Sequence, residues 1–136
     1  MEKFKFLEHT ADVKFQAFGN SLEEAFENSA LALQEVITKK IKIKSVIKKK
    51  IEVEGRDKEA LLYNFLEEFL FLLDSENFIL NKIKKINIKD NKLIAEVIGD
   101  KAGNYKFTND VKAITYNSMF VKKQGKVYIC QVVVDV

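Results

Sequence analysis

The sequence predicts an α+β fold in which two helices pack on a largely antiparallel sheet, in the order ββαβα followed by further strands. Two stretches have the apolar spacing of amphipathic helices, and the segments around them alternate apolar and polar residues. The 136 residues include five glycines and no proline, and 47% are hydrophobic, which favours regular elements joined by short turns. We therefore expect a single domain over residues 1–136 with a sizeable core.

The N-terminal part predicts two strands and a helix. Alternation over residues 4–19 indicates two strands joined by a tight corner at EHTAD, residues 8–12. Ser21 and Glu24 have the spacing of a capping box, in which each side chain accepts a backbone N–H at the helix start. The helical spacing after them extends to about Thr38.

The remaining chain predicts a strand, a second helix and then strands only. Residues 40–54 alternate with period two until Gly55, and Asp57 is in position to cap a helix with a broad apolar face. From Phe78 onward the pattern is that of strands. The turn signals between them are Asp90–Asn91, Gly99–Asp100, Gly103–Asn104 and residues 122–126.

The composition excludes several functional classes. A net charge of +3, from 23 basic and 20 acidic side chains, is too weak to indicate a dedicated nucleic-acid binder. The one cysteine, Cys130, excludes an internal disulfide framework, and its place in a valine-rich strand predicts a buried thiol rather than a nucleophile. No signal pattern or membrane-length apolar stretch is present, so we expect a soluble, cytoplasmic protein without a membrane partner.

Lysines crowd residues 39–50, which we expect to include a lysine-rich strand. They are Lys39, Lys40, Lys42, Lys44, Lys48, Lys49 and Lys50. One interpretation is a surface that contacts RNA phosphates. The other is an exposed strand whose lysines prevent pairing with other chains. No aromatic residue interleaves the lysines to stack on bases, so we favour the second interpretation.

His9 is the only histidine, which limits the available chemistry. A two-histidine zinc motif is impossible, one cysteine excludes a four-sulfur site, and no nucleophile motif or glycine-rich phosphate loop is present. We expect His9 to be a hydrogen-bonded structural residue of the corner between the strands.

Acidic groups raise a different hypothesis at the end of the chain. Asp135 lies beside the terminal carboxylate of Val136, and two adjacent negative groups repel unless a cation lies between them. Asp12 opens an apolar strand. If that strand and the last one are neighbours, three carboxylates converge, and such ligands suit a hard cation. The alternatives are that Asp12 merely caps the corner and that the last residues are a frayed tail.

Three separated motifs, in one order, resemble the archease family. EHTADVKFQAFGNSLEEAFENSALAL resembles its N-terminal signature, NDVKAITYNSMFV its second signature, and VVVDV its hydrophobic-Asp-hydrophobic ending. The segment LLYNFLEEFLFLLDSENF also fits the family in length and order. The resemblance therefore covers essentially the whole chain.

The resemblance implies an accessory role without catalysis of its own. Archeases are cofactor proteins of the GTP-dependent RNA ligase that joins tRNA exon halves in tRNA splicing. They promote guanylylation of its active-site histidine and repeated turnover, so tRNA would be reached indirectly, through the ligase. The family's metal ligands correspond to Asp12, Asp135 and Val136. Calcium is the usual ion, with Mg²⁺ or Mn²⁺ as alternatives.

The chain matches the second signature at Lys112 and Tyr116, which are candidates for a partner-binding surface. It departs from the family pattern at Lys14, where glycine is usual, and at Asn117, where histidine is usual. A further family histidine is absent at residues 105–107. The alternative function is a small RNA-binding or RNA-chaperone module that uses the lysine-rich strand. An independent metal-dependent hydrolase would lack a general base or nucleophile.

Overall fold

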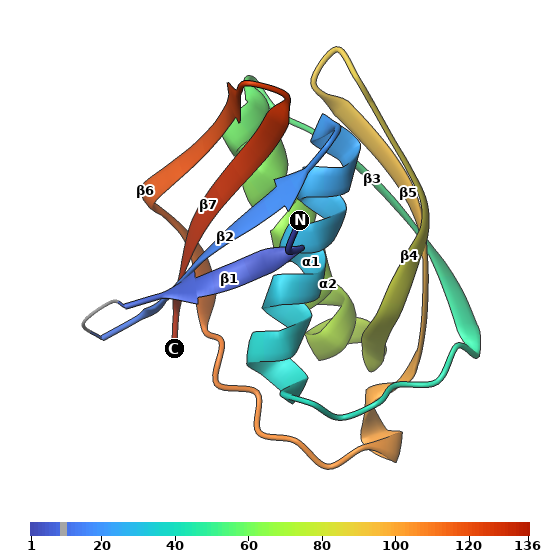
Figure 1. Ribbon diagram of the computed structural model, residues 1–136. Coiled ribbons are helices and arrows are strands. Elements are labelled where there is room, and N and C mark those ends of the chain that lie inside the picture. The colour runs from blue at the N-terminus through green and yellow to red at the C-terminus, as the bar shows by residue number, and fades with distance from the viewer. Residues whose placement is uncertain (9–10) are drawn as a thin grey trace.

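The computed structural model describes residues 1–8 and 11–136, which form three layers with both helices between two antiparallel sheets (Figure 1). The first sheet has the strand order β1-β2-β7-β6 and the second the order β3-β5-β4. The predicted fold class and element order are confirmed, while the division of the strands into two sheets was not predicted. The elements are β1 (Phe4–Leu7), β2 (Val13–Gly19), α1 (Leu22–Thr38), β3 (Ile47–Glu54), α2 (Lys58–Glu76), β4 (Phe78–Lys89), β5 (Lys92–Lys101), β6 (Ala113–Gln124) and β7 (Val127–Asp135), with a 3-10 turn at Ala102–Asn104.

The helix α1 begins where its capping residues predict. The Ser21 hydroxyl accepts the backbone N–H of Glu24 at 3.1 Å, and the Glu24 carboxylate accepts the backbone N–H of Asn20 at 2.8 Å. Two backbone N–H groups at the start of the helix, which have no acceptor within the helix, therefore form hydrogen bonds with side chains. The helix packs on β2 and β7 of the first sheet and on β4 of the second.

The helix α2 is apolar on more than one side because both sheets cover it. It packs on β6 of the first sheet and on β3 and β4 of the second. Asp57 caps it as predicted, and its carboxylate accepts the backbone N–H of Ala60 at 2.7 Å. Its buried side chains are Ala60, Leu61, Leu62, Phe65, Leu66, Phe69, Leu70 and Leu72.

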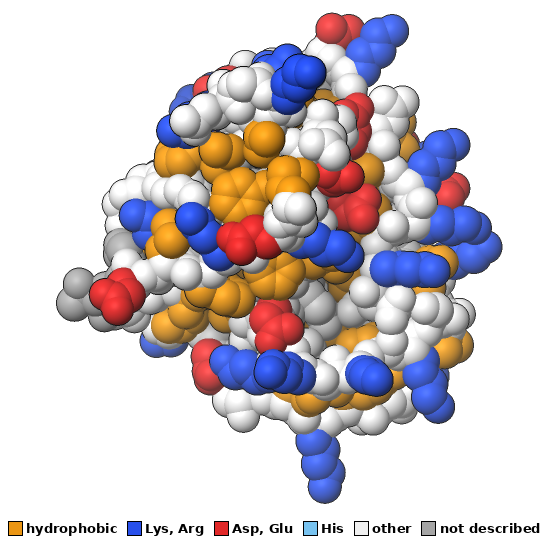
Figure 2. All heavy atoms as spheres, viewed as in Figure 1, with side chains coloured by type: hydrophobic (Ala, Val, Ile, Leu, Met, Phe, Trp, Pro, Cys, Tyr) orange, Lys and Arg blue, Asp and Glu red, His pale blue; other side chains and the backbone are white. Residues whose placement is uncertain are grey.

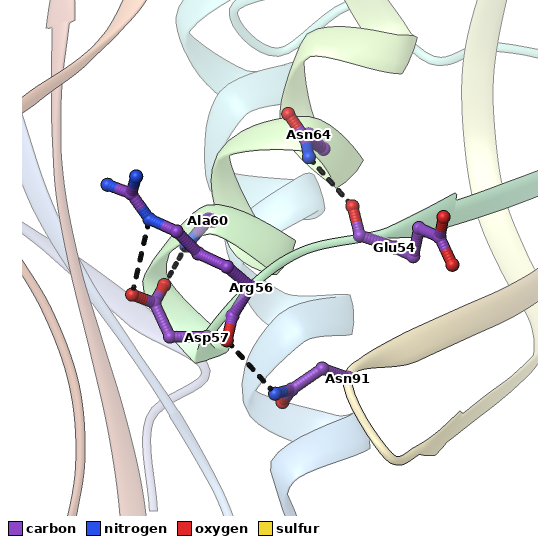
Figure 3. Close-up of polar contacts among 6 residues, drawn as sticks. All are labelled: Glu54, Arg56, Asp57, Ala60, Asn64 and Asn91. Carbon is purple, nitrogen blue, oxygen red and sulfur yellow. Dashed lines mark hydrogen bonds and ion pairs between the residues drawn. The ribbon is translucent and has the colours of Figure 1, made fainter.

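Side-chain amides fix the turn that joins β3 to α2 (Figure 3). Asn64 of α2 donates to the carbonyl of Glu54 at 2.8 Å, and Asn91 donates to the carbonyl of Arg56 at 3.5 Å. The turn is therefore connected both to the helix that follows it and to the β4–β5 turn.

The strand predicted over residues 40–54 is correct only from Ile47 onward. Residues 40–46 form no strand, because this segment crosses from the end of α1 to the second sheet. Side chains of other segments bind part of its backbone, while the N–H of Val46 donates to the carbonyl of Gly99 at 2.8 Å. The Tyr105 hydroxyl accepts the N–H of Lys44 at 2.9 Å, and the Asn81 amide donates to the carbonyl of Ile43. The lysine-rich strand is thus limited to residues 47–50 of the cluster.

The loop predicted at Gly99–Asp100 is also wrong, because both residues lie in β5. A Cβ at Gly99 would overlap the carbonyl oxygen of Ile79, so the glycine permits close approach of two strands instead of a turn. The turn predicted at Asp90–Asn91 is confirmed, and both residues have positive φ, at 52° and 58°.

The chain ends in an ordered central strand. In β7, Val132, Val133 and Val134 have 0% exposure, and the strand extends to Asp135 between β2 and β6. Cys130 is fully buried, as predicted, and desolvation raises the pKa of its thiol to about 12. No helix of the described residues is long and apolar enough to cross a bilayer.

Candidate metal centre at the C-terminus

The pairing of β2 with β7 brings the predicted metal ligands to one end of the first sheet. The two strands are antiparallel, and their last described pair is Val13 with Val134. Asp12 directly precedes Val13 and Asp135 directly follows Val134, so the two aspartates occupy the next positions on neighbouring strands. Both residues are partly buried. The condition set by the sequence, that the two strands be neighbours, is therefore met.

Contacts with β6 and with the core fix the last two residues of the chain. Asp135 pairs with Ala113 of β6, and its carbonyl accepts the backbone N–H of Lys112 at 2.7 Å. The side chain of Val136 packs against the hydrophobic core and is partly buried. Figure 1 shows the C-terminus beside the end of the first sheet at which β1 and β2 are joined. We call this end of the sheet, with Asp12, Asp135 and Val136, the C-terminal edge.

The donor chemistry at the C-terminal edge fits a hard divalent cation. Asp12, Asp135 and the carboxylate of Val136 offer oxygen atoms only, which is the ligand type that Ca²⁺, Mg²⁺ and Mn²⁺ prefer. Residues 1–8 and 11–136 contain no group of three or more His, Cys, Asp or Glu side chains that could hold a metal. The third donor of this candidate site is therefore a main-chain carboxylate rather than a third acidic side chain.

The two predicted partner-binding residues lie in different places. Lys112 is exposed beside the C-terminal edge. Tyr116 lies four residues further along β6, roughly 13 Å for an extended strand, and stacks on Tyr63 of α2 with ring centroids 4.3 Å apart. It is 51% exposed. Burial, and then the neighbouring Glu67, raise the pKa of Tyr63.

Of the residues that depart from the family pattern, Lys14 lies close to the candidate ligands, two residues after Asp12 on the same strand. Lys14 faces Val133 in the β2–β7 pairing, and Asn117 lies in an irregular stretch of β6 between Thr115 and Phe120. Tyr105, in the segment that lacks the family histidine, donates to Asp100 at 2.6 Å. His9 lies outside the described residues.

Gln131 is a buried polar residue of β7 that the sequence pattern did not single out. It is 7% exposed, accepts a hydrogen bond from the Gln16 amide at 2.8 Å and donates to the carbonyl of Ser118 at 2.7 Å. Ser118 has a φ of 55° and lies in the irregular stretch of β6 that carries Tyr116. The available signal was a single glutamine inside the apolar run ICQVVV.

Comparisons with known proteins agree over the full length of the chain. The model of the Archease protein family (MTH1598/TM1083) matches residues 4–136. The chain is 42% identical to the protein archease of Pyrococcus furiosus over 143 aligned positions, and 38% identical to that of Sulfurisphaera tokodaii, with both chains fully covered in each case.

Solved structures give the same result. The solution structure of protein 1598 from Methanobacterium thermoautotrophicum matches with a TM-score of 0.84 at 34% identity and covers all of both chains. The crystal structure of an archease from Thermotoga maritima has a TM-score of 0.66 and 24% identity over 97% of this chain and 96% of that one, a likeness of fold alone. The family model and the full-length relatives show that the chain belongs to the archease family.

Proposed function

We propose that this chain is a metal-binding accessory protein that activates the GTP-dependent tRNA-splicing RNA ligase. It would promote guanylylation of the ligase and its multiple turnover in tRNA exon ligation, without catalysis of its own, in the cytoplasm. The observation that carries the proposal is the β2–β7 pairing, which brings Asp12 and Asp135 together in a member of the archease family.

The proposed cofactor is a divalent ion, with Ca²⁺ first and Mg²⁺ or Mn²⁺ as alternatives. Asp12, Asp135 and the Val136 carboxylate would bind it, because three carboxylates form the all-oxygen donor set that these ions prefer. The ion would supply positive charge at the C-terminal edge. The buried valines of β7 support this role, since ligands on a rigid central strand lose little freedom on binding.

The chain's own residues would provide the contact with the ligase. Lys112 is exposed beside the C-terminal edge, where its backbone N–H donates to the carbonyl of Asp135. Tyr116 offers an exposed ring face held by its stack on Tyr63, next to a hollow lined by Arg56 and Asn64. We propose Lys112 as a contact near the metal and Tyr116 as a second contact further along β6.

The test is guanylylation of the cognate ligase by labelled GTP, with and without this protein. Asp12→Ala and Asp135→Ala are expected to lose the stimulation while the circular dichroism spectrum stays that of the unmodified chain. Asp74→Ala removes an exposed acidic side chain from α2 and is the matched control, expected to stimulate fully. Full stimulation by both the Asp12 and Asp135 variants would falsify the role of the metal site.

A further inference from the structure

The second sheet presents lysines from all three of its strands on one face. In its register, Lys48 faces Ile98, which faces Lys82, and in the next outward row Lys50 faces Glu96, which faces Lys85. These rows point away from the helices because the alternate positions, such as Ile51 and Val97, are buried in the core. We call the outward lysines the lysine face. They are Lys48, Lys50, Lys82, Lys84, Lys85, Lys89 and Lys92.

A bulge in β4 increases the number of lysines on this face. Strict alternation would turn one of the adjacent Lys84 and Lys85 toward the core. The register shifts between Ile83 and Lys85, so Lys84 is an extra residue and both lysines are exposed, while Ile83 and Ile86 both pack toward the core. Lys84 lines a hollow of about 290 Å³ together with Lys48 and Lys50.

Protection of the sheet edges, where lysine is favoured, accounts for lysines on the edge strands β3 and β4 but not for Lys92 on the central strand β5. It also does not require that one sign dominate the face, since soluble surfaces usually intersperse both signs. Here β4 has no acidic residue, and the outward acids of the sheet are Glu52, Glu54 and Glu96. Seven lysines against three glutamates leave an excess of four positive charges, larger than the +3 of the whole chain. Figure 2 shows Lys and Arg side chains along the side where this sheet lies.

Lys49 of β3 does not belong to the lysine face. It points to the inner side, facing Val97, and forms an ion pair with Glu76 of α2 at 2.6 Å. Lys50 forms an exposed ion pair with Glu52 at 2.9 Å. No ion pair within 4.0 Å joins any other member of the lysine face to the residues that the structure describes.

We propose that the lysine face binds the phosphodiester backbone of RNA directly. Spaced ammonium groups over a sheet match a polyanion, and no aromatic side chain lies among the outward residues of the face to stack on bases. Binding is therefore independent of sequence and strongly dependent on salt. That the lysine face binds a polyanion follows from its charge and does not depend on the ligase. That this polyanion is RNA rests on the proposed function. The face is separate from the C-terminal edge, which lies on the other sheet.

The test is fluorescence anisotropy of a fluorescein-labelled 5′ tRNA half, titrated with the protein alone over a series of salt concentrations. The variant Lys48→Ala/Lys82→Ala/Lys84→Ala/Lys85→Ala removes four members of the face. We expect it to bind at least about tenfold more weakly and to lower the salt slope by about 3, since each contact to single-stranded phosphate contributes about 0.7. The matched control, Lys58→Ala/Lys106→Ala/Lys123→Ala/Lys126→Ala, removes the same charge from exposed positions outside the second sheet and is expected to retain the slope.

Three outcomes overturn the proposal: no binding by the unmodified protein, equal loss by both variants, or equal binding to phosphatidylglycerol vesicles through the same lysines. The last would assign the face to an anionic membrane surface. Ligase guanylylation, measured without RNA, is expected to be stimulated normally by the variant of the lysine face. If the unmodified protein does not stimulate guanylylation, the proposed function is rejected. The anisotropy measurement still tests RNA binding by the lysine face in that case.

Discussion

Val13 and Val134 face each other across β2 and β7, and this single pairing sets the position of every candidate ligand at the C-terminal edge. Asp12 precedes the first valine and Asp135 follows the second. A shift of one residue in the register would separate the aspartates and turn the buried valines of β7 to the other side of the sheet. The hydrophobic pattern that stabilises the sheet therefore also fixes the geometry of the candidate site.

One residue added after Val136 is expected to weaken calcium binding. An added glycine moves the terminal carboxylate one residue further along and replaces it by a neutral amide at the position of Val136. We expect a loss of at least about tenfold in Ca²⁺ affinity, or about 1.4 kcal/mol, measured by isothermal titration calorimetry. Val136→Ile keeps both the carboxylate and an apolar side chain, and it should bind normally. Unchanged affinity of the extended chain would exclude the terminal carboxylate as a ligand.

Replacement of Gln131 is expected to destabilise the irregular stretch of β6. Gln131→Leu leaves the carbonyl of Ser118 and the amide of Gln16 without their present partner, at a cost of about 1–3 kcal/mol in the free energy of unfolding. Denaturant unfolding measures this cost, and hydrogen exchange should increase at residues 116–119. Gln16→Ala is the control, because it removes one hydrogen bond and leaves the bond to Ser118. Equal losses for both variants would contradict the role of the Ser118 contact.

Asp100 is expected to make stability depend on pH in the acid range. The hydrogen bond from the Tyr105 hydroxyl, followed by that from the backbone N–H of Lys101, lowers the pKa of Asp100 from 3.8. Its ionised form is thus favoured in the folded chain. The contribution is complete above the unfolded pKa and is lost as the pH falls through the lower folded value.

Thermal unfolding of Asp100→Asn measures this contribution. The variant should have a midpoint a few degrees lower than the unmodified chain at pH 7, and the difference should shrink below about pH 4. Asp110→Asn changes an exposed acidic residue of a loop and should not alter the midpoint at either pH. A difference for Asp100→Asn that is constant from pH 7 to pH 3 would show that ionisation is not the cause.

Local signals predicted most of the fold. The caps at Ser21 and Asp57 act within four residues, and the Asp90–Asn91 turn has its own backbone preference, so these features were readable from short segments. Residues 40–46 alternate as a strand does, yet the side chains of Tyr105 and Asn81, from distant segments, bind the backbone of Lys44 and Ile43. Non-local contacts override an alternating pattern there, and the sequence alone does not reveal them.

The candidate site likewise has residues that the sequence predicts and a neighbouring residue that only non-local contacts reveal. Asp12, Asp135 and Val136 could be proposed together because a family resemblance connected two distant motifs, and the register agrees with that connection. Gln131 was missed because its role depends on a carbonyl across the sheet, in a stretch of β6 whose irregularity alternation does not predict. The lysine face was missed for the same reason, since the lysines of β4 join those of β3 only through the strand register.

Cys130 is expected to be unreactive in the folded protein. Its thiol has 0% exposure, and desolvation raises its pKa to about 12, against an ordinary value of 9.0, so its thiolate fraction near pH 8 is lower by about a thousandfold. A thiol-exchange reagent such as Ellman's reagent should therefore react only as fast as the chain opens, and should find one equivalent in guanidinium chloride. Lys126→Cys places a second thiol in an exposed turn and should give one fast equivalent in the native state. A fast equivalent in the unmodified folded chain would show that the first sheet opens around β7 and would weaken the rigid-edge argument for the metal site.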